Sequence, residues 1–492
     1  MNLPLKLSEL QSGLARIFSQ FEMGALVTLE NETIFVKYET LPDIGTLPQA
    51  AQICQAYLKL QEGDMALLND PYSGGTVLSM MTLVTPVKLA SGMTFLLVHR
   101  LGFRPRLSLF EKLDEEGLRI PPTPLVQNHQ INESIFSAIE SHPFCPQGFG
   151  VRLRAAMTRT FQAREQLKVL FQNLSPGPAP QKEMLKNYFK HSKEIVQIRL
   201  DEWPSGETKV ELSSDRGDTI QLQMALSDNG LNLNFRGTSP SKKTCLTESA
   251  TFGACFGAFK AFLGGRIPVN HGSFSFLHLS TPLGCLLNAK YPSPTFKGMT
   301  DGSAMVAATV MQGLGKIVTH LEMGQGASTL AKLELCFKDG SRFYDVLPGG
   351  AGATSQGPGA DGLSYWVRDQ LQPSVEEIEK RFPILIRKIG VRAGSAGKGH
   401  HSGGQGLFKQ YELLQDAHLS WLLEQTKHKP QGVRGGQAGS IGEIFVSRKG
   451  EAKKELLNFE GSIDLKAGDK IILHSAGGGG WGSFKEAADD KT

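Results

Sequence analysis

The spacing of apolar residues predicts several helices in the first two hundred residues of this 492-residue chain. Leu7–Phe21 places apolar side chains at positions 7, 10, 14, 17, 18 and 21, which is the repeat of an amphipathic helix. Further helices are predicted at Leu47–Leu60, Val151–Leu174 and Lys182–Trp203. The proline-rich segment 176–180 separates the last two, because proline cannot continue a helix.

Alternating apolar and polar positions predict strands, mostly in hairpins. Met81–Leu89 and Met93–His99 form the simplest hairpin, with a turn at 90–92. Three more strands are predicted at Lys209–Ser213, Thr219–Leu226 and Leu231–Phe235, the last two joined by a turn at 228–230. Because the strands come in hairpins and not in strand–helix–strand units, the pattern argues against a doubly wound nucleotide-binding fold.

The second half of the chain predicts fewer helices. Glu248–Leu263 and Ala304–Val318 are helical in pattern, and after His320 strands alternate with glycine-rich loops. One short helix is predicted at Ser374–Phe382, with Ser374 as its N-cap and Glu377 in the capping-box position.

These patterns together predict an α+β protein of several subdomains, with antiparallel hairpins, long helices and a glycine-rich, β-rich C-terminal region. We predict four regions. They are an N-terminal α+β region (1–205), a strand hairpin with helices (206–320), a glycine-rich β region (321–483) and a frayed, charged tail (484–492).

Composition and charge narrow the class of protein. The formal net charge is only +4, from 52 basic and 48 acidic residues, so neither nucleic acid nor a membrane surface is expected as a partner. Met1–Lys6 has no secretory-signal pattern and no apolar run approaches the ~20 residues of a membrane span, so we expect a cytoplasmic protein. The six cysteines form no CxxC pair and are interpreted as ordinary buried thiols, although a catalytic cysteine stays open.

Glycine is the one compositional outlier, at 55 of 492 residues. Most of the excess lies after residue 345, in four runs at 348–362, 394–406, 432–442 and 477–482. The simplest interpretation of any single run is a β-rich region with tight turns. Four runs in one region also indicate backbones packed closely around a pocket or a subunit interface.

An apolar run at 65–68 leads directly into Asn-Asp-Pro-Tyr-Ser-Gly-Gly-Thr at 69–76, a strand that ends in a hydrogen-bonding turn. This turn resembles the signature of the hydantoinase B/5-oxoprolinase family, whose relatives include the large subunits of acetone and acetophenone carboxylases. Seven further segments resemble that family in the right order, from about Glu22 to Gly482. They are 115–122 (Glu-Glu-Gly), 235–240, 267–272 (Ile-Pro-Val-Asn-His-Gly), 281–284, 349–353 with Asp361-Gly362, 394–398 with 435–436, and 477–482.

The resemblance implies a metal site that this chain does not complete. The family holds a divalent metal through His and Asp in one loop and His in a second, and these positions here are Val77, Met80 and Gly102. An Asp of the second loop falls at Pro105, and an upstream family His falls at Asp43. Valine and glycine offer no ligand, and the Met80 thioether suits Cu(I) rather than hard divalent ions. We therefore expect no metal at these positions.

Other residues are weighed as replacements or as pocket candidates. His99 is interpreted as a surface residue at a strand end, and His400-His401 lack a third donor. Asp70 is the best remaining carboxylate, with a turn-capping role as the alternative. The substrate-pocket candidates are Asn69, Asp70, Tyr72, Gly74, Gly75, Thr76, Arg100 and Asp361.

The resemblance implies a subunit that acts with a hydantoinase A-like partner in the ATP-dependent hydrolysis of cyclic amides such as hydantoin or 5-oxoproline. The sequence contains neither a P-loop nor a GxGxxG that follows a strand, so ATP is expected on the partner and no cofactor on this chain. The alternative is a catalytically inactive pseudoenzyme, kept as a structural or regulatory subunit after its metal ligands were lost.

Overall fold

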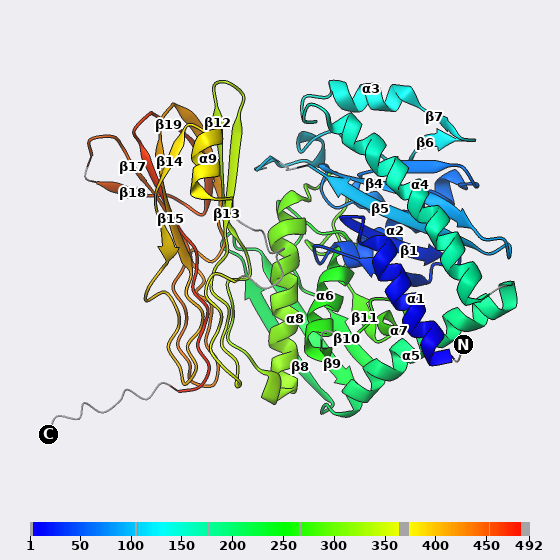
Figure 1. The fold of residues 1–492 in the computed structure, drawn as a ribbon. Helices are drawn as coiled ribbons and strands as arrows, with labels where there is room; N and C mark the ends of the chain where they lie inside the picture. The colour runs from blue at the N-terminus through cyan, green and yellow to red at the C-terminus, as the bar shows by residue number, and fades with distance from the viewer. Residues whose placement is uncertain are drawn as a thin grey trace. The chain divides into compact units, whose positions relative to one another are not determined.

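The computed structural model describes residues 3–483 apart from 104–105, 108, 176, 265–266, 364–372 and 452. The chain forms two compact units (Figure 1). The first comprises Met1–Glu207 and Gln223–Ser303, and the second comprises Thr208–Leu222 and Ala304–Thr492. The four regions predicted from the sequence stay a prediction, and the tail 484–492 lies outside the described residues.

A seven-stranded antiparallel sheet is the centre of the first unit, with the order β2-β1-β5-β4-β3-β6-β7. Its strands are β1 (Met23–Thr28), β2 (Thr33–Lys37), β3 (Met65–Leu68), β4 (Met80–Lys88), β5 (Thr94–Gly102), β6 (Thr123–Gln127) and β7 (Gln130–Ile131). The β4–β5 hairpin confirms the predicted one.

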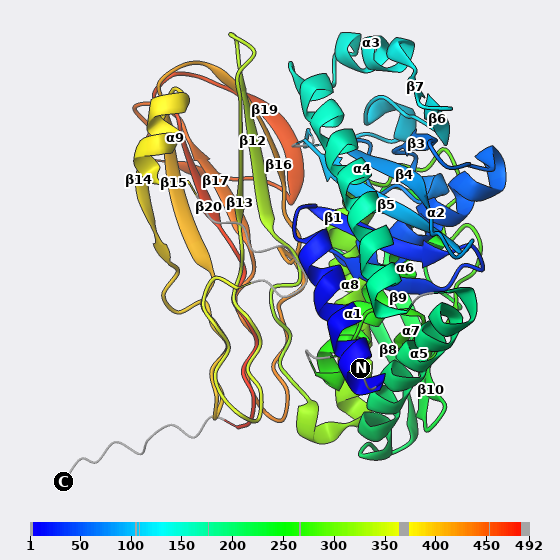
Figure 2. The same cartoon turned by 45° about the vertical axis from the view of Figure 1, so that its right-hand side comes forward.

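Helices cover both faces of this sheet, which explains why β1, β3, β4 and β5 are buried along almost their whole length, whereas the edge strand β7 is exposed. On β3, Ala66 and Leu68 share a core with α2 (Asp43–Leu58), whereas Met65 and Leu67 share one with α4 (Phe149–Leu174). Successive strand residues point to opposite faces, so each face receives every second side chain. A third core joins α1 (Leu3–Phe18), α4 and α5 (Pro178–Asp201). Figure 2 shows the ribbons of these three helices near one another.

The first unit also contains elements outside this sheet. They include α3 (Glu133–Ser141), α6 (Glu248–Leu263), α7 (His271–Phe274), the π-helical turn η3 (Gly298–Gly302) and the 3₁₀ turns η1 (Pro71–Ser73) and η2 (Leu113–Glu115). A second sheet has the order β11-β10-β9-β8, with β8 (Gly206–Ser213), β9 (Thr219–Ser227), β10 (Gly230–Asn234) and β11 (Leu277–Ser280). The chain leaves the first unit within β8, after Glu207, and returns to it within β9, at Gln223.

The second unit contains two antiparallel sheets that share one apolar core. The first sheet has the order β13-β12-β16-β19 and consists of β12 (Ala331–Phe337), β13 (Arg342–Leu347), β16 (Ala417–Leu422) and β19 (Glu460–Leu465). The other has the order β14-β15-β20-β17-β18 and consists of β14 (Ile384–Val391), β15 (Leu407–Leu413), β17 (Glu443–Ser447), β18 (Lys454–Leu456) and β20 (Lys470–His474). The unit also holds α8 (Ser303–Ile317), whose first residue Ser303 belongs to the first unit, η4 (Thr319–Leu321) and α9 (Val375–Arg381). The Ser374 hydroxyl accepts a hydrogen bond from the Glu377 N–H at 3.2 Å, which confirms the predicted N-cap.

Glycine-rich segments of the second unit run side by side beyond the sheets and bond to one another through their backbones. Gly478 N–H donates to the Gly404 carbonyl at 2.9 Å, and Gly397 N–H donates to the Gly478 carbonyl at 2.8 Å. A Cβ atom at Gly478 would overlap the carbonyl oxygen of Ala351. Glycine is therefore required here because another backbone occupies the place of a side chain.

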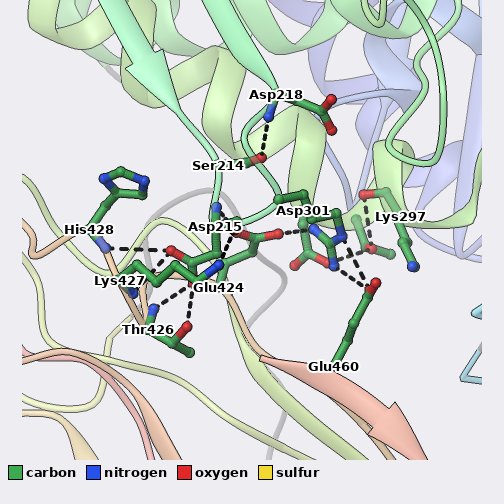
Figure 3. A network of polar contacts seen from close by, with 12 residues as sticks. Ser214, Asp215, Asp218, Lys297, Asp301, Glu424, Thr426, Lys427, His428 and Glu460 are labelled. Carbon is green, nitrogen blue, oxygen red and sulfur yellow. Dashed lines mark hydrogen bonds and ion pairs between the residues drawn. The ribbon is translucent and has the colours of Figure 1, made fainter. Parts of the chain in front are cut away.

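The β8–β9 turn is fastened within the second unit by the carboxylate of Asp215 (Figure 3). This buried carboxylate accepts hydrogen bonds from the backbone N–H groups of Thr426, Lys427 and His428, and from the Thr426 hydroxyl at 2.7 Å. Arg216, the next residue, forms ion pairs with Glu424 and Glu460.

The predicted fold class is confirmed, because the chain combines long helices with antiparallel sheets. Two expectations need correction. Helix α5 begins at Pro178 rather than at Lys182. Proline is tolerated at the first position of a helix, because the backbone N–H that it lacks would have no hydrogen-bond partner there. Strands β1 and β2 were not predicted. Among the described residues, no helix combines the length and the apolar character needed to cross a membrane.

Candidate functional site

The turn at 69–76 is held in the first unit by Asn69, the first residue after β3. Its side chain is fully buried. The Asn69 Oδ1 atom accepts a hydrogen bond from the Ile120 N–H at 2.6 Å, and Nδ2 donates to the carbonyls of Leu78 and Leu118, both at 2.7 Å. Asn69 therefore uses its whole amide to join the turn to the segment 116–120.

Asp70 and Tyr72 are also engaged with the protein itself. The Asp70 carboxylate accepts from the Tyr72 N–H at 3.1 Å and forms an ion pair with Arg119 at 2.8 Å. The Tyr72 hydroxyl donates to the Ser293 carbonyl at 2.9 Å. Burial raises the pKa of the Tyr72 phenol well above its ordinary value, so Tyr72 stays a neutral donor.

The two glycines and Thr76 shape the rest of the turn. Gly74 has φ of 93°, a left-handed conformation that favours glycine. A Cβ atom at Gly75 would overlap the Asn69 carbonyl oxygen, so the chain can fold back on itself only with glycine there. The Thr76 carbonyl accepts from the Thr295 hydroxyl at 3.4 Å.

Arg100 lies beneath this turn with no exposed surface. Its guanidinium donates to Asp43 Oδ1 at 2.7 Å, to the Thr46 hydroxyl at 2.9 Å and to the Gly74 carbonyl at 2.5 Å. Its Nε donates to the Thr82 hydroxyl at 2.9 Å. Arg100 thus supports the turn from inside the core, and Asp43 serves as its counter-ion.

The three family ligand positions lie together in the structure but offer no suitable donor set. Met80 N–H donates to the Val77 carbonyl at 2.9 Å, and Met80 stands directly opposite Gly102 in the β4–β5 register. The Met80 sulfur fills the space where a Cβ atom at Gly102 would lie. A divalent metal needs several nitrogen or oxygen donors at ~2.0–2.6 Å, and these residues supply one thioether, so they do not fit the group. Pro105 lies outside the described residues.

The alternative histidine ligands are also accounted for. His99 is buried within β5, and the prediction of a surface position was wrong. Its Nδ1 lies 2.8 Å from the Thr160 hydroxyl, and its ring stacks on Phe21 with centroids 4.1 Å apart. Burial lowers the pKa of His99 to about 3, so the ring is neutral. The sequence-based interpretation missed this burial because β5 is apolar on both faces of the sheet.

His400, His401 and Asp361 belong to the second unit. The rings of the two histidines lie 4.6 Å apart, and Asp361 Oδ1 accepts from the Gln405 N–H at 2.6 Å. Across the residues that the structure describes, no group of three or more His, Cys, Asp or Glu side chains is placed to hold a metal ion.

Glu116 is the residue of this region that sequence reasoning did not select. Its Oε1 accepts from the Phe296 N–H at 3.0 Å. Its Oε2 atom is buried and has no hydrogen-bond partner among the described residues, although the side chain as a whole is partly exposed. Burial raises the pKa of Glu116 to about 7. The signal in the sequence was the Glu-Glu-Gly pattern at 115–117, which gave no reason to prefer one carboxylate.

Arg119, three residues on, completes a polar group beside the turn. Its guanidinium lies over the ring of Tyr291 at 4.4 Å and bonds to Asp70, while its Nε is buried without a partner in the described part of the chain. A carboxyl that titrates near neutral pH can accept or donate a proton, and a guanidinium with a free N–H can bind a polar ligand. The candidate site therefore consists of Asp70, Tyr72, Glu116, Arg119 and the turn that places them.

Comparison with known proteins gives related sequences along almost the whole chain. The chain is 24% identical to an uncharacterized protein of Methanocaldococcus jannaschii over 95% of this chain and 85% of that protein. It is 24% identical to the 5-oxoprolinase of Saccharomyces cerevisiae over 87% of this chain, but it spans only 36% of that longer protein. It is 23% identical to the putative B-type subunit of a D-/L-hydantoinase from a Pseudomonas species, over 63% of this chain and 55% of that one.

Two solved structures share the fold. The ATP-dependent caprolactamase of Pseudomonas jessenii superposes with a TM-score of 0.86 at 17% identity, over 98% of this chain and 90% of that chain. Nucleotide-free acetone carboxylase superposes with a TM-score of 0.82 at 13% identity, over 97% of this chain and 76% of that chain. The family model described as hydantoinase B/oxoprolinase matches residues 23–484, and the chain therefore belongs to the hydantoinase B/oxoprolinase family.

Proposed function

We propose that this chain is the B-type component of an ATP-dependent enzyme that opens cyclic amides of the hydantoin or 5-oxoproline type. In this proposal a hydantoinase A-like subunit carries the ATP site, and this chain needs no cofactor of its own. The relatives support the class of reaction, since they include 5-oxoprolinases, a B-type hydantoinase component and the fold of an ATP-dependent caprolactamase. The cytoplasmic location stays a prediction.

The observation that carries the proposal is Glu116 beside the turn at 69–76. Two hydrogen bonds of Asn69, with Leu118 and Ile120, join the turn to the segment 116–120, and the ion pair of Arg119 with Asp70 adds a third link, so the segment that carries Glu116 is held against the turn. A general base works best when its pKa lies near the working pH, and that of Glu116 is about 7.

The chemistry follows from these groups without a metal. The ring amide is activated by ATP on the partner, as the family resemblance implies, and water then attacks the activated carbon. In our proposal deprotonated Glu116 accepts the proton of that water, and Arg119 stabilises the negative charge that develops on oxygen. The ring C–N bond then breaks, protonated Glu116 returns the proton to the leaving nitrogen, and a second water releases phosphate from the acyl phosphate that remains. No step uses the positions of Val77, Met80 and Gly102, because their side chains offer no suitable ligand.

A second candidate is the pseudoenzyme, and a specific observation favours it. The Met80 sulfur lies where a Cβ atom at position 102 would be, so the structure leaves no room for a ligating side chain at Gly102. In this alternative the chain serves as a structural or regulatory subunit, and the hydrogen-bonded turn is kept for its contribution to the fold.

Reconstitution distinguishes the two functions. The tagged chain is isolated gently and its partners are identified by native mass spectrometry. The A-like subunit is then assayed for ATP-dependent opening of 5-oxoproline, hydantoin and caprolactam, with wild type, with E116Q and without this chain.

The proposal predicts turnover only with wild type, a loss of about 100-fold or more in E116Q, and a rise of kcat/KM with pH through about 7. Glu111→Gln, on an exposed residue of the same loop, is the matched control and keeps full activity. Turnover that is equal with wild type and E116Q would instead assign the chain a non-catalytic role.

A further inference from the structure

The first unit contains a groove of about 870 Å³, and none of its lining residues belongs to the candidate site. One wall is the helix α5, and the opposite side is formed by the β1–β2 turn, the β4–β5 turn and His271. A volume of this size is typical of a site for a small molecule or a short peptide segment.

The wall formed by α5 carries a row of four exposed lysines, Lys182, Lys186, Lys190 and Lys193. Spacings of four, four and three residues place them on one side of the helix, and the row is about 16 Å long at 1.5 Å per residue. Lys190 forms a long ion pair with Glu194 at 3.7 Å. In the described part of the chain, Lys182, Lys186 and Lys193 have no carboxylate within ion-pair distance, so their charge is available to a ligand.

The rest of the groove is not uniformly basic. Leu29 is 42% exposed at the β1–β2 turn and Met93 is half-buried, whereas Phe189 lines the groove with only 6% of its surface exposed. Glu30 and Glu32 also line the groove, and Glu32 lies 3.9 Å from His271. A ligand of this groove therefore meets a row of cations on one side and a mixed apolar and acidic surface on the other.

These features favour a polypeptide over a phosphate ligand. A row of about 16 Å matches roughly five residues of extended chain at 3.3 Å each. The four cations are lysines and include no arginine, and arginine is the residue that binds phosphate through paired hydrogen bonds. Two carboxylates on the opposite wall would repel a dense polyanion, whereas a peptide can place neutral side chains there.

We propose that this groove binds an acidic segment of a partner protein, with Asp or Glu side chains on the lysine row and apolar side chains on Leu29 and Met93. The site is independent of the proposed chemistry, because it uses none of the residues assigned to ring opening. A groove of this kind gives association that is steered by charge and weakened by salt.

The test uses fluorescence anisotropy of the full chain with a labelled eight-residue peptide that alternates Glu and Leu. A peptide with Gln in place of Glu is the matched ligand control. Wild type binds the Glu peptide at least about tenfold more tightly than the Gln peptide at low salt, and the difference shrinks as salt rises.

The triple variant K182E/K186E/K190E loses at least about tenfold in affinity for the Glu peptide, since three attractions become three repulsions. The matched protein control is K59E/K380E/K388E, which changes the net charge equally at three exposed lysines outside the groove. Its affinity changes less than about twofold. K182Q/K186Q/K190Q, which only removes charge, gives the same direction of change if the reversed variant folds poorly.

Three results would overturn the proposal. The first two are equal affinities for the Glu and Gln peptides, and equal losses of affinity for the Glu peptide in the groove and control variants. The third is displacement of the labelled peptide by inorganic tripolyphosphate at a lower concentration than unlabelled peptide requires. The last result would assign the groove to a phosphate ligand. Because the measurement needs no substrate and no A-like subunit, its failure leaves the ring-opening proposal untouched, and failure of ring opening leaves the groove untouched.

Discussion

At the scale of single residues, the polar side chains of the family turn are almost all used by the protein itself. Asn69 joins two loops, Asp70 binds Arg119, and Arg100 supports Gly74 from the core. Such buried networks are stable only when every group has a partner. The exceptions are therefore informative, and two of them, Glu116 Oε2 and Arg119 Nε, lie on one short segment beside the turn.

The raised pKa of Glu116 makes a prediction about stability. In the unfolded chain this carboxyl ionises near 4.5, whereas in the folded chain it keeps its proton up to about pH 7. The folded state therefore binds more protons between these values, and wild type loses stability as pH rises through that window. The variant E116Q has no charge to bury, so it gains on wild type by on the order of 2 kcal/mol between pH 4.5 and pH 8.

Urea unfolding at a series of pH values measures this difference. The matched control E111Q changes an exposed carboxylate in the same loop, whose ion pair with Lys243 lowers its pKa, so this variant keeps a constant offset from wild type between pH 4.5 and pH 8. A constant gap between E116Q and wild type from pH 4.5 to pH 8 would mean that Glu116 ionises normally in the folded chain and cannot be the proposed base near pH 7.

The family ligand positions make a second prediction, of gained metal binding. Val77, Met80 and Gly102 lie close together in the backbone. What they lack for binding a divalent metal is nitrogen or oxygen donor atoms on their side chains. We expect V77H/M80D/G102H to bind about one equivalent of Co²⁺, because two imidazoles and a carboxylate then converge and the loss of the Met80 sulfur makes room at position 102. The visible absorption of bound Co²⁺ measures it, and V77H alone is the control. Co²⁺ bound equally by wild type would show a site that the ligand positions do not explain.

At the scale of elements, the β8–β9 turn makes the third prediction. Asp215 accepts hydrogen bonds from three successive N–H groups after β16, so D215A leaves buried donors without an acceptor. We expect a loss of about 3 kcal/mol in the free energy of unfolding. Asp228, which is exposed in the β9–β10 turn, is the matched position, and D228A costs less than about 0.5 kcal/mol. Similar losses at both positions would mean that the carboxylate does not fasten the turn.

Elements were predictable where one face of the element is apolar or where a cap residue marks its end. The helices α4, α6 and α8 begin and end within two residues of the predicted bounds, and Ser374 caps α9 as expected. Strands β1 and β2 were missed because both are short and almost fully buried, so they show no alternation of polar and apolar residues.

The site was only partly predictable for a related reason. The sequence located the turn at 69–76, because its residue types are unusual in that order. It could not show that Arg100 and His99 are buried, since a strand covered by helices on both faces carries no polar side to mark the surface. It also could not choose Glu116 over Glu115, because the difference between them arises from burial by the segment around Phe296, far away in the sequence.

At the scale of the whole molecule, the residues that resemble the family are divided between two units. Asn69, Asp70 and Tyr72 lie in the first, whereas Asp361 and the segment 394–398 lie in the second. The glycine-rich segments belong to the second unit, where backbones from four parts of the chain bond to one another. The composition of the chain is thus explained by the packing of one unit and needs no glycine-rich ligand loop.

Gly478 makes the last prediction, because it lies where these backbones meet. A Cβ atom there would overlap the Ala351 carbonyl oxygen, and Gly478 also bonds to Gly404 and Gly397 through its backbone. G478A must therefore push two rigid backbones apart, at a cost of about 3 kcal/mol in the free energy of unfolding. Gly357, whose Cβ position is open, is the matched site, and G357A changes stability by less than about 0.5 kcal/mol.

Hydrogen exchange of G478A measures where the structure loosens. We expect faster exchange in the second unit and unchanged exchange in the seven-stranded sheet. Equal stability of G478A and G357A would show that the glycine runs tolerate side chains, and their abundance would then require a cause other than backbone packing.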